Sequence, residues 1–100
     1  SEKERNAISV RIELQADYLA GVWARSIQDR NLLDIGDIEE AMNAAHAVGD
    51  DTLQEQAYGY SGPDSFTHGT SEQRMRWFKR GYQYGDLQHG DTFSLSDSEL

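Results

Sequence analysis

Two acidic side chains, Glu13 and Asp17, combine a residue type and a spacing that could hold a metal ion or move a proton. At about 100° per residue, residues four apart lie only about 40° from each other on one face of an α-helix. A buried carboxylate is costly unless it is paired, protonated or bound to a metal. The pattern therefore leaves three interpretations open for Glu13: a metal or catalytic site, an ion pair with an arginine such as Arg11, or exposure to water. The residues that border the acidic strip on its two sides are apolar: Ile12, Leu19 and Trp23, and Val10, Leu14 and Tyr18.

The segment that must position these acids is expected to be one long helix, from about Arg5 to Gln28. It contains no proline, and Gly21 is its only strong interruption. The small residues Ala16, Ala20 and Gly21 would let a neighbouring helix approach closely. Because the helix is apolar around most of its circumference, it is expected to be buried. The aromatic residues expected in the core are Trp23, Trp77 and Phe78.

Shorter helices are expected to follow the long one. After a loop at residues 29–35, a second helix is expected to start at Asp37, which is a good N-cap, and to end at Gly49, which suits a C-terminal cap. A short third helix is expected at residues 51–58. The glycine-, serine- and proline-containing stretch 59–65 is typical of a loop.

A fourth helix is expected to begin near Thr70 or Ser71, because Thr70 and Gln73 have the spacing of a capping box. Beyond Gly85 the chain is polar and aperiodic, and its last residues are expected to fray. No strand alternation is found. The sequence therefore predicts an all-α fold over residues 1–100, a single helical domain with one long N-terminal helix packed with two or three shorter helices and an irregular C-terminal tail. The apolar stripe of the fourth helix consists of Met75, Phe78 and Tyr82.

The chain is strongly acidic, since eighteen Asp and Glu residues against nine Lys and Arg residues give a formal net charge of −9. Such a surface repels phosphate groups, so neither a nucleic acid nor an anionic membrane surface is expected as a partner. The absence of cysteine excludes disulfides and thiolate metal ligands from this chain. A local basic cluster at residues 74–80 is expected to pair with the acidic helices.

Several blocks of sequence, in the same order, resemble the neutral zinc metallopeptidase family of bacteria. The resemblance covers about residues 8–93, and its most specific block runs from Asp64 to Arg74 and continues at 76–78. The blocks that carry the resemblance are residues 10–17, 20–23, 36–41, 47–51, 64–74 and 76–78.

The resemblance implies a mechanism. Members of this family resemble gluzincins, in which an H-E-x-x-H helix gives two zinc-binding histidines and a general base, and a downstream E-x-x-A-D segment gives a further glutamate. Glu13, Ala16 and Asp17 match that segment. The resemblance thus implies that Glu13 is the third zinc ligand and that Asp17, one turn further on, orients a ligand histidine. Three protein ligands leave one position for the water that attacks a peptide carbonyl.

The H-E-x-x-H helix itself is not in this sequence. His46, His68 and His89 are its only histidines, and none has a second histidine four residues on. In family members that helix precedes the segment seen here, so the chain is expected to be an excised C-terminal part of a larger metallopeptidase domain. The zinc ion is then expected in the full-length parent, with none tightly bound to this fragment, which should be inactive alone. The resemblance also suggests a bacterial, membrane-anchored parent.

His68 and Arg74 are the next candidates, because related gluzincins carry a histidine followed six residues later by an arginine near the metal. On that resemblance His68 is a possible donor to the oxyanion formed during peptide cleavage, and Arg74 a partner of Asp17 or Glu13. From the residues alone, His68 is equally well explained as a loop residue that caps the next helix. From the residues alone, Arg74 is explained as a structural ion-pair partner. His46 and His89 are expected to be uncoordinated.

The sequence departs from the family pattern at two positions. Many members have cysteine where Tyr18 stands and another near Gly90, and both are missing here. If those cysteines form a bridge in other members, this chain has lost both halves together.

Two functions follow from these observations. The first is a portion of a zinc metallopeptidase that acts on peptide or protein substrates. The alternative is a non-catalytic helical module that binds a protein partner. If the catalytic helix normally covers Glu13 and Asp17, its removal exposes an apolar-edged groove. We therefore expect either self-association through the long helix or a groove filled by the chain's own tail.

Overall fold

The computed structural model describes residues 1–30, 35–47, 49–59 and 66–100. Within them the chain forms four α-helices and one short 3₁₀ helix, with no strand, so the all-α prediction is confirmed for this part of the chain. Most of the loops expected at 29–35 and 59–65, and the side chain of His46, lie outside the described residues. The elements are α1 (Glu2–Asp29), α2 (Ile35–Ala47), α3 (Asp50–Tyr58), α4 (Ser71–Tyr84) and the 3₁₀ helix Asp97–Glu99.

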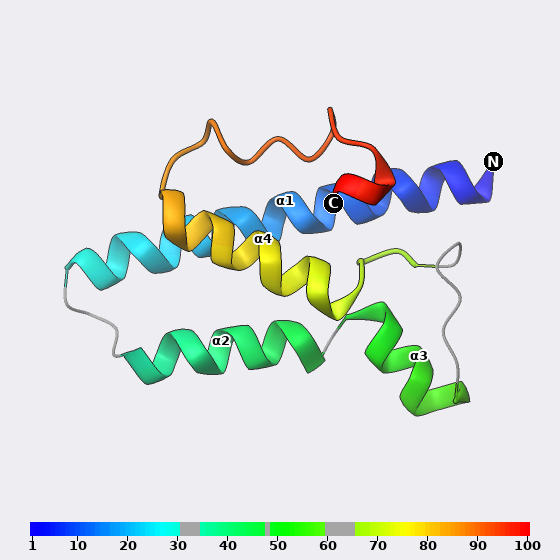
Figure 1. Cartoon of the computed structure of the whole chain (residues 1–100), viewed down its shortest axis with the longest axis horizontal. Helices are drawn as coiled ribbons and strands as arrows, with labels where there is room; N and C mark the ends of the chain where they lie inside the picture. The colour runs from blue at the N-terminus through cyan, green and yellow to red at the C-terminus, as the bar shows by residue number, and fades with distance from the viewer. Residues whose placement is uncertain (31–34, 48, 60–65) are drawn as a thin grey trace.

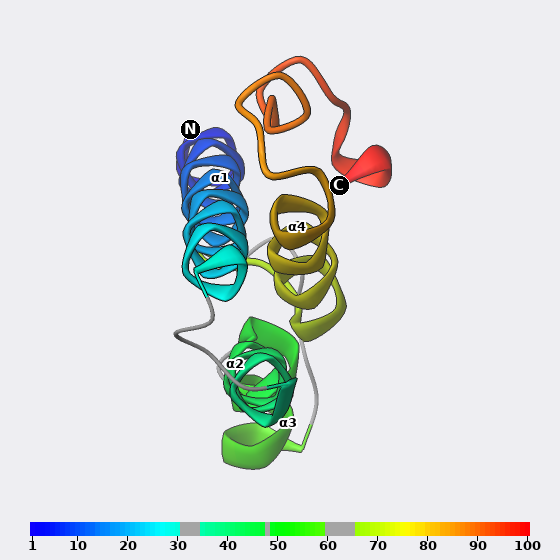
Figure 2. The ribbon, with the colours of Figure 1, turned by 90° about the vertical axis from the view of Figure 1, so that its left-hand side faces the viewer.

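Helix α4 lies between α1 and α2, and the C-terminal tail returns along α1 and α4 (Figure 1). The view turned by 90° shows the same order of helices, with α3 below α4 on the side of α2 (Figure 2). None of the described helices is both long and apolar enough to cross a membrane. The arrangement places the acidic strip of α1 next to the N-terminal half of α4.

The two longest helices touch through glycines. A Cβ atom added at Gly21 of α1 would overlap the backbone carbonyl oxygen of Phe78, and one added at Gly81 of α4 would overlap that of Tyr18. The expected close approach at Gly21 is confirmed. Ala16 and Ala20, which were expected to share it, are exposed instead.

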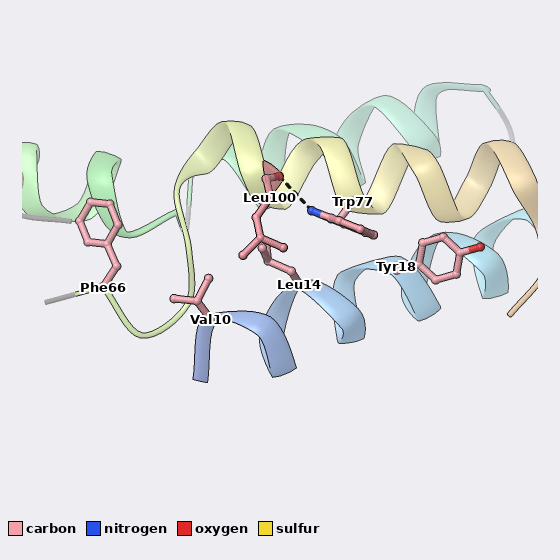
Figure 3. Packing of buried hydrophobic residues seen from close by; sticks show 6 residues of the cluster. All are labelled: Val10, Leu14, Tyr18, Phe66, Trp77 and Leu100. Carbon is pink, nitrogen blue, oxygen red and sulfur yellow. Dashed lines mark hydrogen bonds between the residues drawn. The ribbon is translucent and has the colours of Figure 1, made fainter. Parts of the chain in front are cut away.

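The core lies between α1, α4 and the end of the tail (Figure 3). Trp77 and Phe78 are buried as expected. Trp23 is not in the core, because its side chain is 63% exposed. The described residues contact α1 mainly on the side that faces α4 and the tail, so the expected burial of this helix holds for that side and is wrong for the side that carries Trp23. The buried cluster consists of Val10, Leu14, Tyr18, Phe66, Trp77 and Leu100.

The ends of the middle helices differ from the prediction. Helix α2 begins at Ile35, two residues before Asp37, which therefore lies in the first turn and is not the cap. Gly49 has extended φ and ψ of −66° and 144° and caps the N-terminus of α3, so it does not end α2 as a left-handed residue. A Cβ at Gly49 would overlap the backbone of Ser71. The glycine is thus required by close packing against the start of α4.

The polar tail is anchored and does not fray. The indole Nε1 of Trp77 donates to the carbonyl oxygen of Leu100 at 3.0 Å, as the dashed line in Figure 3 shows. Arg11 donates to the carbonyl oxygen of Leu95 at 2.9 Å and to Asp97 at 2.7 Å. The prediction of a frayed tail failed because these contacts join polar groups of the tail to α1 and α4. The tail has no helical or strand periodicity that would reveal such contacts.

Tyr18 joins α1 to the start of the tail. Its hydroxyl lies 2.8 Å from the Asp86 carboxylate, and burial together with this carboxylate raises the pKa of Tyr18 to about 12. Partial burial raises the pKa of Asp86, but hydrogen bonds from Tyr18 and His89 outweigh it and hold that pKa below its ordinary value. A Cβ at Gly90 would overlap the Tyr18 ring. The two positions at which the sequence departs from the family pattern are therefore neighbours in space.

Candidate functional site

Glu13 lies at the edge of the contact between α1 and the segment that precedes α4. Its side chain is 36% exposed, and its Oε1 atom is 3.5 Å from Nδ1 of His68. The arginines proposed as partners of Glu13 lie elsewhere: Arg11 bonds to the tail, and Arg74 bonds to Asp17. The prediction of an arginine pair is therefore wrong for Glu13, and the residue that meets it is a histidine.

The segment around His68 is held on both sides. Phe66 is buried, and Gly69 has a left-handed φ of 95°, with Leu14 and Val10 as the neighbours of the position that a Cβ would take. A side chain at this φ would be strained, so glycine is required here. These two anchors fix the backbone on either side of His68.

The capping alternative for His68 is not what the structure contains. Thr70 accepts a hydrogen bond from the backbone N–H of Gln73 at 3.0 Å, and Gln73 accepts one from the N–H of Thr70 at 2.9 Å, which forms the expected capping box. Asp51 of α3 accepts a further hydrogen bond from the N–H of Ser71 at 2.7 Å. The cap of α4 thus comes from Thr70 and Gln73, and the His68 side chain points toward Glu13.

Asp17 and Arg74 form a two-bond ion pair between α1 and α4. The Nε and Nη2 atoms of Arg74 donate to the two Asp17 oxygens at 2.9 and 3.0 Å, and the side chains are only 13% and 16% exposed for Asp17 and Arg74. Burial raises the pKa of the Asp17 carboxyl, and the Arg74 guanidinium offsets only part of that rise. Of the two partners expected for Arg74, Asp17 and Glu13, the structure contains the pair with Asp17.

The two acids of the strip therefore have different surroundings. Asp17 is committed to Arg74 and joins two helices, whereas Glu13 keeps contact with solvent beside His68. A carboxylate oxygen and an imidazole nitrogen are both ligands that zinc accepts. The sequence pattern gave no reason to single out Phe66 or Gly69, which hold this segment in place. The signal that was available for Gly69 was its position directly before the capping residue Thr70.

A zinc ion needs more ligands than these residues offer. Among residues 1–30, 35–47, 49–59 and 66–100, no three His, Cys, Asp or Glu side chains gather in a group that could hold a metal ion. Catalytic zinc sites use three protein ligands and a water. Glu13 suits one position of such a site, and the described part of the chain does not complete it.

A large apolar face of α1 adjoins Glu13. Ile8, Ile12, Leu19 and Trp23 are 45–63% exposed, and they share one side of the helix with the exposed Ala16 and Ala20. Contiguous exposed apolar surface of this kind marks sites that bind another protein segment. The tail packs on the side of Arg11 and Tyr18 and leaves this face uncovered.

The chain is similar to proteins from several bacteria. It is 56% identical over 96 residues to the uncharacterised protein YpfJ of Escherichia coli K12, an alignment that covers 96% of this chain and 33% of that protein. It is 45% identical over 98 residues to uncharacterised proteins of Mycobacterium bovis and Mycobacterium tuberculosis, which covers 88% of this chain and 33% of each of them. No solved structure matches the chain.

The family comparison covers the whole candidate site. Residues 1–93 match the family model described as "Putative neutral zinc metallopeptidase", and this range includes Glu13, Asp17, His68 and Arg74. The chain spans about a third of the length of the curated relatives it matches. Because the match extends over nearly all of its residues, the chain belongs to the neutral zinc metallopeptidase family.

Proposed function

We propose that this chain is the C-terminal portion of a zinc-dependent metallopeptidase, in which Glu13 supplies the third zinc ligand. The observation that carries the proposal is the contrast within the acidic strip. Asp17 is bound at both oxygens by Arg74, whereas the equally placed Glu13 is 36% exposed beside His68. A residue that binds a metal whose other ligands come from another part of the protein must be accessible, and Glu13 is accessible. When bound, zinc would polarise the peptide carbonyl and activate water.

The remaining residues of the site, Asp17, Arg74 and His68, hold and orient the groups around the proposed metal position. Arg74 fixes the Asp17 carboxylate, whose oxygens each keep a lone pair for a further donor such as a ligand histidine. His68 lies within 3.5 Å of Glu13 and carries an N–H that could donate to an oxyanion next to the metal. The ion pair between Asp17 and Arg74 also keeps α1 and α4 in register, so Glu13 and His68 stay on adjoining segments.

The exposed face of α1 supports a role in a larger protein. The relatives are about three times as long as the matched segment, and the other zinc ligands would have to come from residues outside those described. Ala16 and Ala20 are small enough to admit a helix close to Glu13, and Ile12 and Trp23 would be covered by it. We infer that this face is where the segment with the remaining ligands packs.

The test of this function is Glu13→Gln in the full-length gene product. We expect bound zinc, measured by atomic emission, to fall by at least roughly tenfold, because an amide oxygen is a much weaker zinc ligand than a carboxylate. Hydrolysis of a fluorescent casein substrate should fall to background. Glu39→Gln, at an exposed position of α2, is the matched control and should leave both quantities unchanged. Full retention of zinc in the Glu13 variant would refute the ligand role.

The exposed face of α1 also favours a second candidate function, a non-catalytic module that binds a protein partner. If that face needs a cover, the isolated 100-residue chain should self-associate through it at high concentration. Leu19→Gln with Trp23→Gln should then return the chain to a monomer in sedimentation equilibrium. Leu87→Gln is the control, since Leu87 is 73% exposed but lies on the tail. A wild-type chain that stays monomeric at every concentration would contradict this prediction. Full-length protein that binds no zinc would favour the module over the peptidase.

A further inference from the structure

The side of α4 that faces away from α1 lines an open groove of about 940 Å³. Helices α2 and α3 line one edge and the tail lines the other, and Figure 2 shows these segments below and above α4. Arg74, which pairs with Asp17, marks the side of α4 toward α1. At about 100° per residue, the groove residues Arg76, Lys79 and Arg80 lie about 140–240° from Arg74 around the helix. The groove is therefore separate from the candidate site.

The basic cluster at residues 74–80 is only partly neutralised by the part of the chain that the structure describes. Arg74 pairs with an acid of α1. The contact of Arg76 with Glu72 of its own helix is exposed and 3.6 Å long, and such a pair contributes little. Lys79 is exposed and makes no hydrogen bond or ion pair with a described residue. The expectation that this cluster pairs with the acidic helices thus holds for Arg74, and the charge of Lys79 is left for another partner.

Arg80 holds its guanidinium in a fixed orientation at the same groove. Its Cζ atom lies 5.5 Å from the centroid of the Trp77 ring and 5.1 Å from that of Tyr84. Its Nε atom donates to the carbonyl oxygen of His89 at 2.8 Å, and no described carboxylate pairs with it. A planar guanidinium that stacks on aromatic rings is preorganised to bind a carboxylate through two N–H groups. The two Nη groups of Arg80 can therefore meet an acidic ligand.

The three carboxylates that line the groove already have partners in this chain. Asp51 accepts the hydrogen bond from the start of α4, and Glu99 accepts two from Ser96, at 2.9 and 2.8 Å. Glu72 contacts Arg76. Among the described residues, the uncompensated charge of the groove is therefore positive, although the chain as a whole carries −9. The apolar and aromatic side chains that also line the groove are Met42, Met75, Trp77, Tyr84 and Leu95.

We propose that this groove binds an acidic segment of a partner protein, whose carboxylates meet Lys79 and Arg80 and whose apolar side chains pack against Met75 and Leu95. A volume of about 940 Å³ accommodates several side chains. Charge decides the class of partner. Two copies of a chain with a net charge of −9 repel each other, and so does a nucleic acid, whereas a short acidic segment meets only the local positive charge. The inference does not depend on the proposed peptidase function.

The test uses the full-length protein and a rhodamine-labelled peptide of sequence Glu-Glu-Leu-Glu-Glu-Leu, with a chelator present so that zinc-dependent cleavage does not consume it. Fluorescence anisotropy should show saturable binding that weakens as salt is added. Lys79→Glu should weaken binding at least about fivefold, because it replaces attraction to the carboxylates by repulsion. Arg5→Glu makes the same change in net charge at an exposed position of α1 and should bind as the wild type does. Equal weakening by Arg5→Glu, or no binding by the wild type, would overturn the proposal.

Changed peptides and one further variant locate the bound segment. Gln in place of each Glu of the peptide should abolish binding, and Ser in place of each Leu should weaken it. Glu13→Gln should bind the original peptide as the wild type does, which separates this groove from the proposed metal site. Unchanged binding of either altered peptide, or loss of binding in Glu13→Gln, would contradict the proposal. It would also fail if an oligo-dT strand displaced the peptide, or if Lys79→Glu abolished self-association of a protein that binds no peptide.

Discussion

Gly81→Ala is expected to destabilise the fold by roughly 3 kcal/mol, a large part of the total stability of a domain of this size. The added methyl group would overlap the carbonyl oxygen of Tyr18, and the backbone nitrogen of Val22 is also close. Backbone atoms of a helix cannot rotate away as a side chain can, so α1 and α4 must separate. Urea denaturation followed by circular dichroism measures the loss as a lower midpoint.

The matched control for this change is Gly36→Ala in α2. A Cβ at Gly36 meets no other heavy atom within 4 Å, and the residue lies inside a helix. Alanine should therefore be neutral or stabilise the helix by up to about 1 kcal/mol. If Gly81→Ala unfolds at the same urea concentration as the wild type, the close contact of the two helices is not present in solution.

Arg74→Met is expected to cost roughly 3 kcal/mol at neutral pH, because it leaves the Asp17 carboxylate buried without its guanidinium partner. The effect should depend on pH. Burial raises the pKa of Asp17 above the ordinary 3.8, and loss of Arg74 raises it further. A carboxyl with a raised folded pKa is stabilised below its unfolded pKa, and that stability is lost as pH rises through the folded pKa. The variant should therefore lie closer to the wild type near about pH 4 than near about pH 7.

Two variants test the origin of this pH dependence. Arg76→Met removes an exposed arginine of the same helix, whose contact with Glu72 is 3.6 Å long, and it should change stability by less than about 1 kcal/mol. Asp17→Asn combined with Arg74→Met removes the carboxylate as well, so the extra loss at neutral pH should disappear. A constant difference between Arg74→Met and the wild type from acid to neutral pH would contradict the assignment to Asp17.

The helices were predictable from local signals that the folded chain uses directly. Thr70 and Gln73 form the capping box that their spacing indicated, and α1 covers the whole segment from about Arg5 to Gln28 that was expected to be helical. The tail was not predictable, because its contacts are specific and distant in sequence. Leu95 offers Arg11 a backbone carbonyl, and Leu100 offers one to Trp77, and any residue type carries that group.

Only part of the candidate site could be predicted from the sequence. The family resemblance indicated Arg74 as a partner of Asp17 or Glu13, and the structure selects Asp17. The contact of Glu13 with His68 depends on Gly69 and on the burial of Phe66, so it needed the tertiary structure. The exposure of Trp23 could not be read from its aromatic type, because an apolar residue that will contact another segment has the same chemistry as a core residue.

The anchoring of the tail has a consequence for the order in which the chain folds during synthesis. Arg11 bonds to Asp97 across 86 residues, and Leu100 packs in the same cluster as Leu14. Contacts between residues so far apart form late, because the intervening chain must first be closed into a loop. During synthesis, α1 therefore receives its last core partner only after residue 100 has emerged. Until then the cluster around Leu14 is incomplete, and this interval is when α1 is most open to chaperones and proteases.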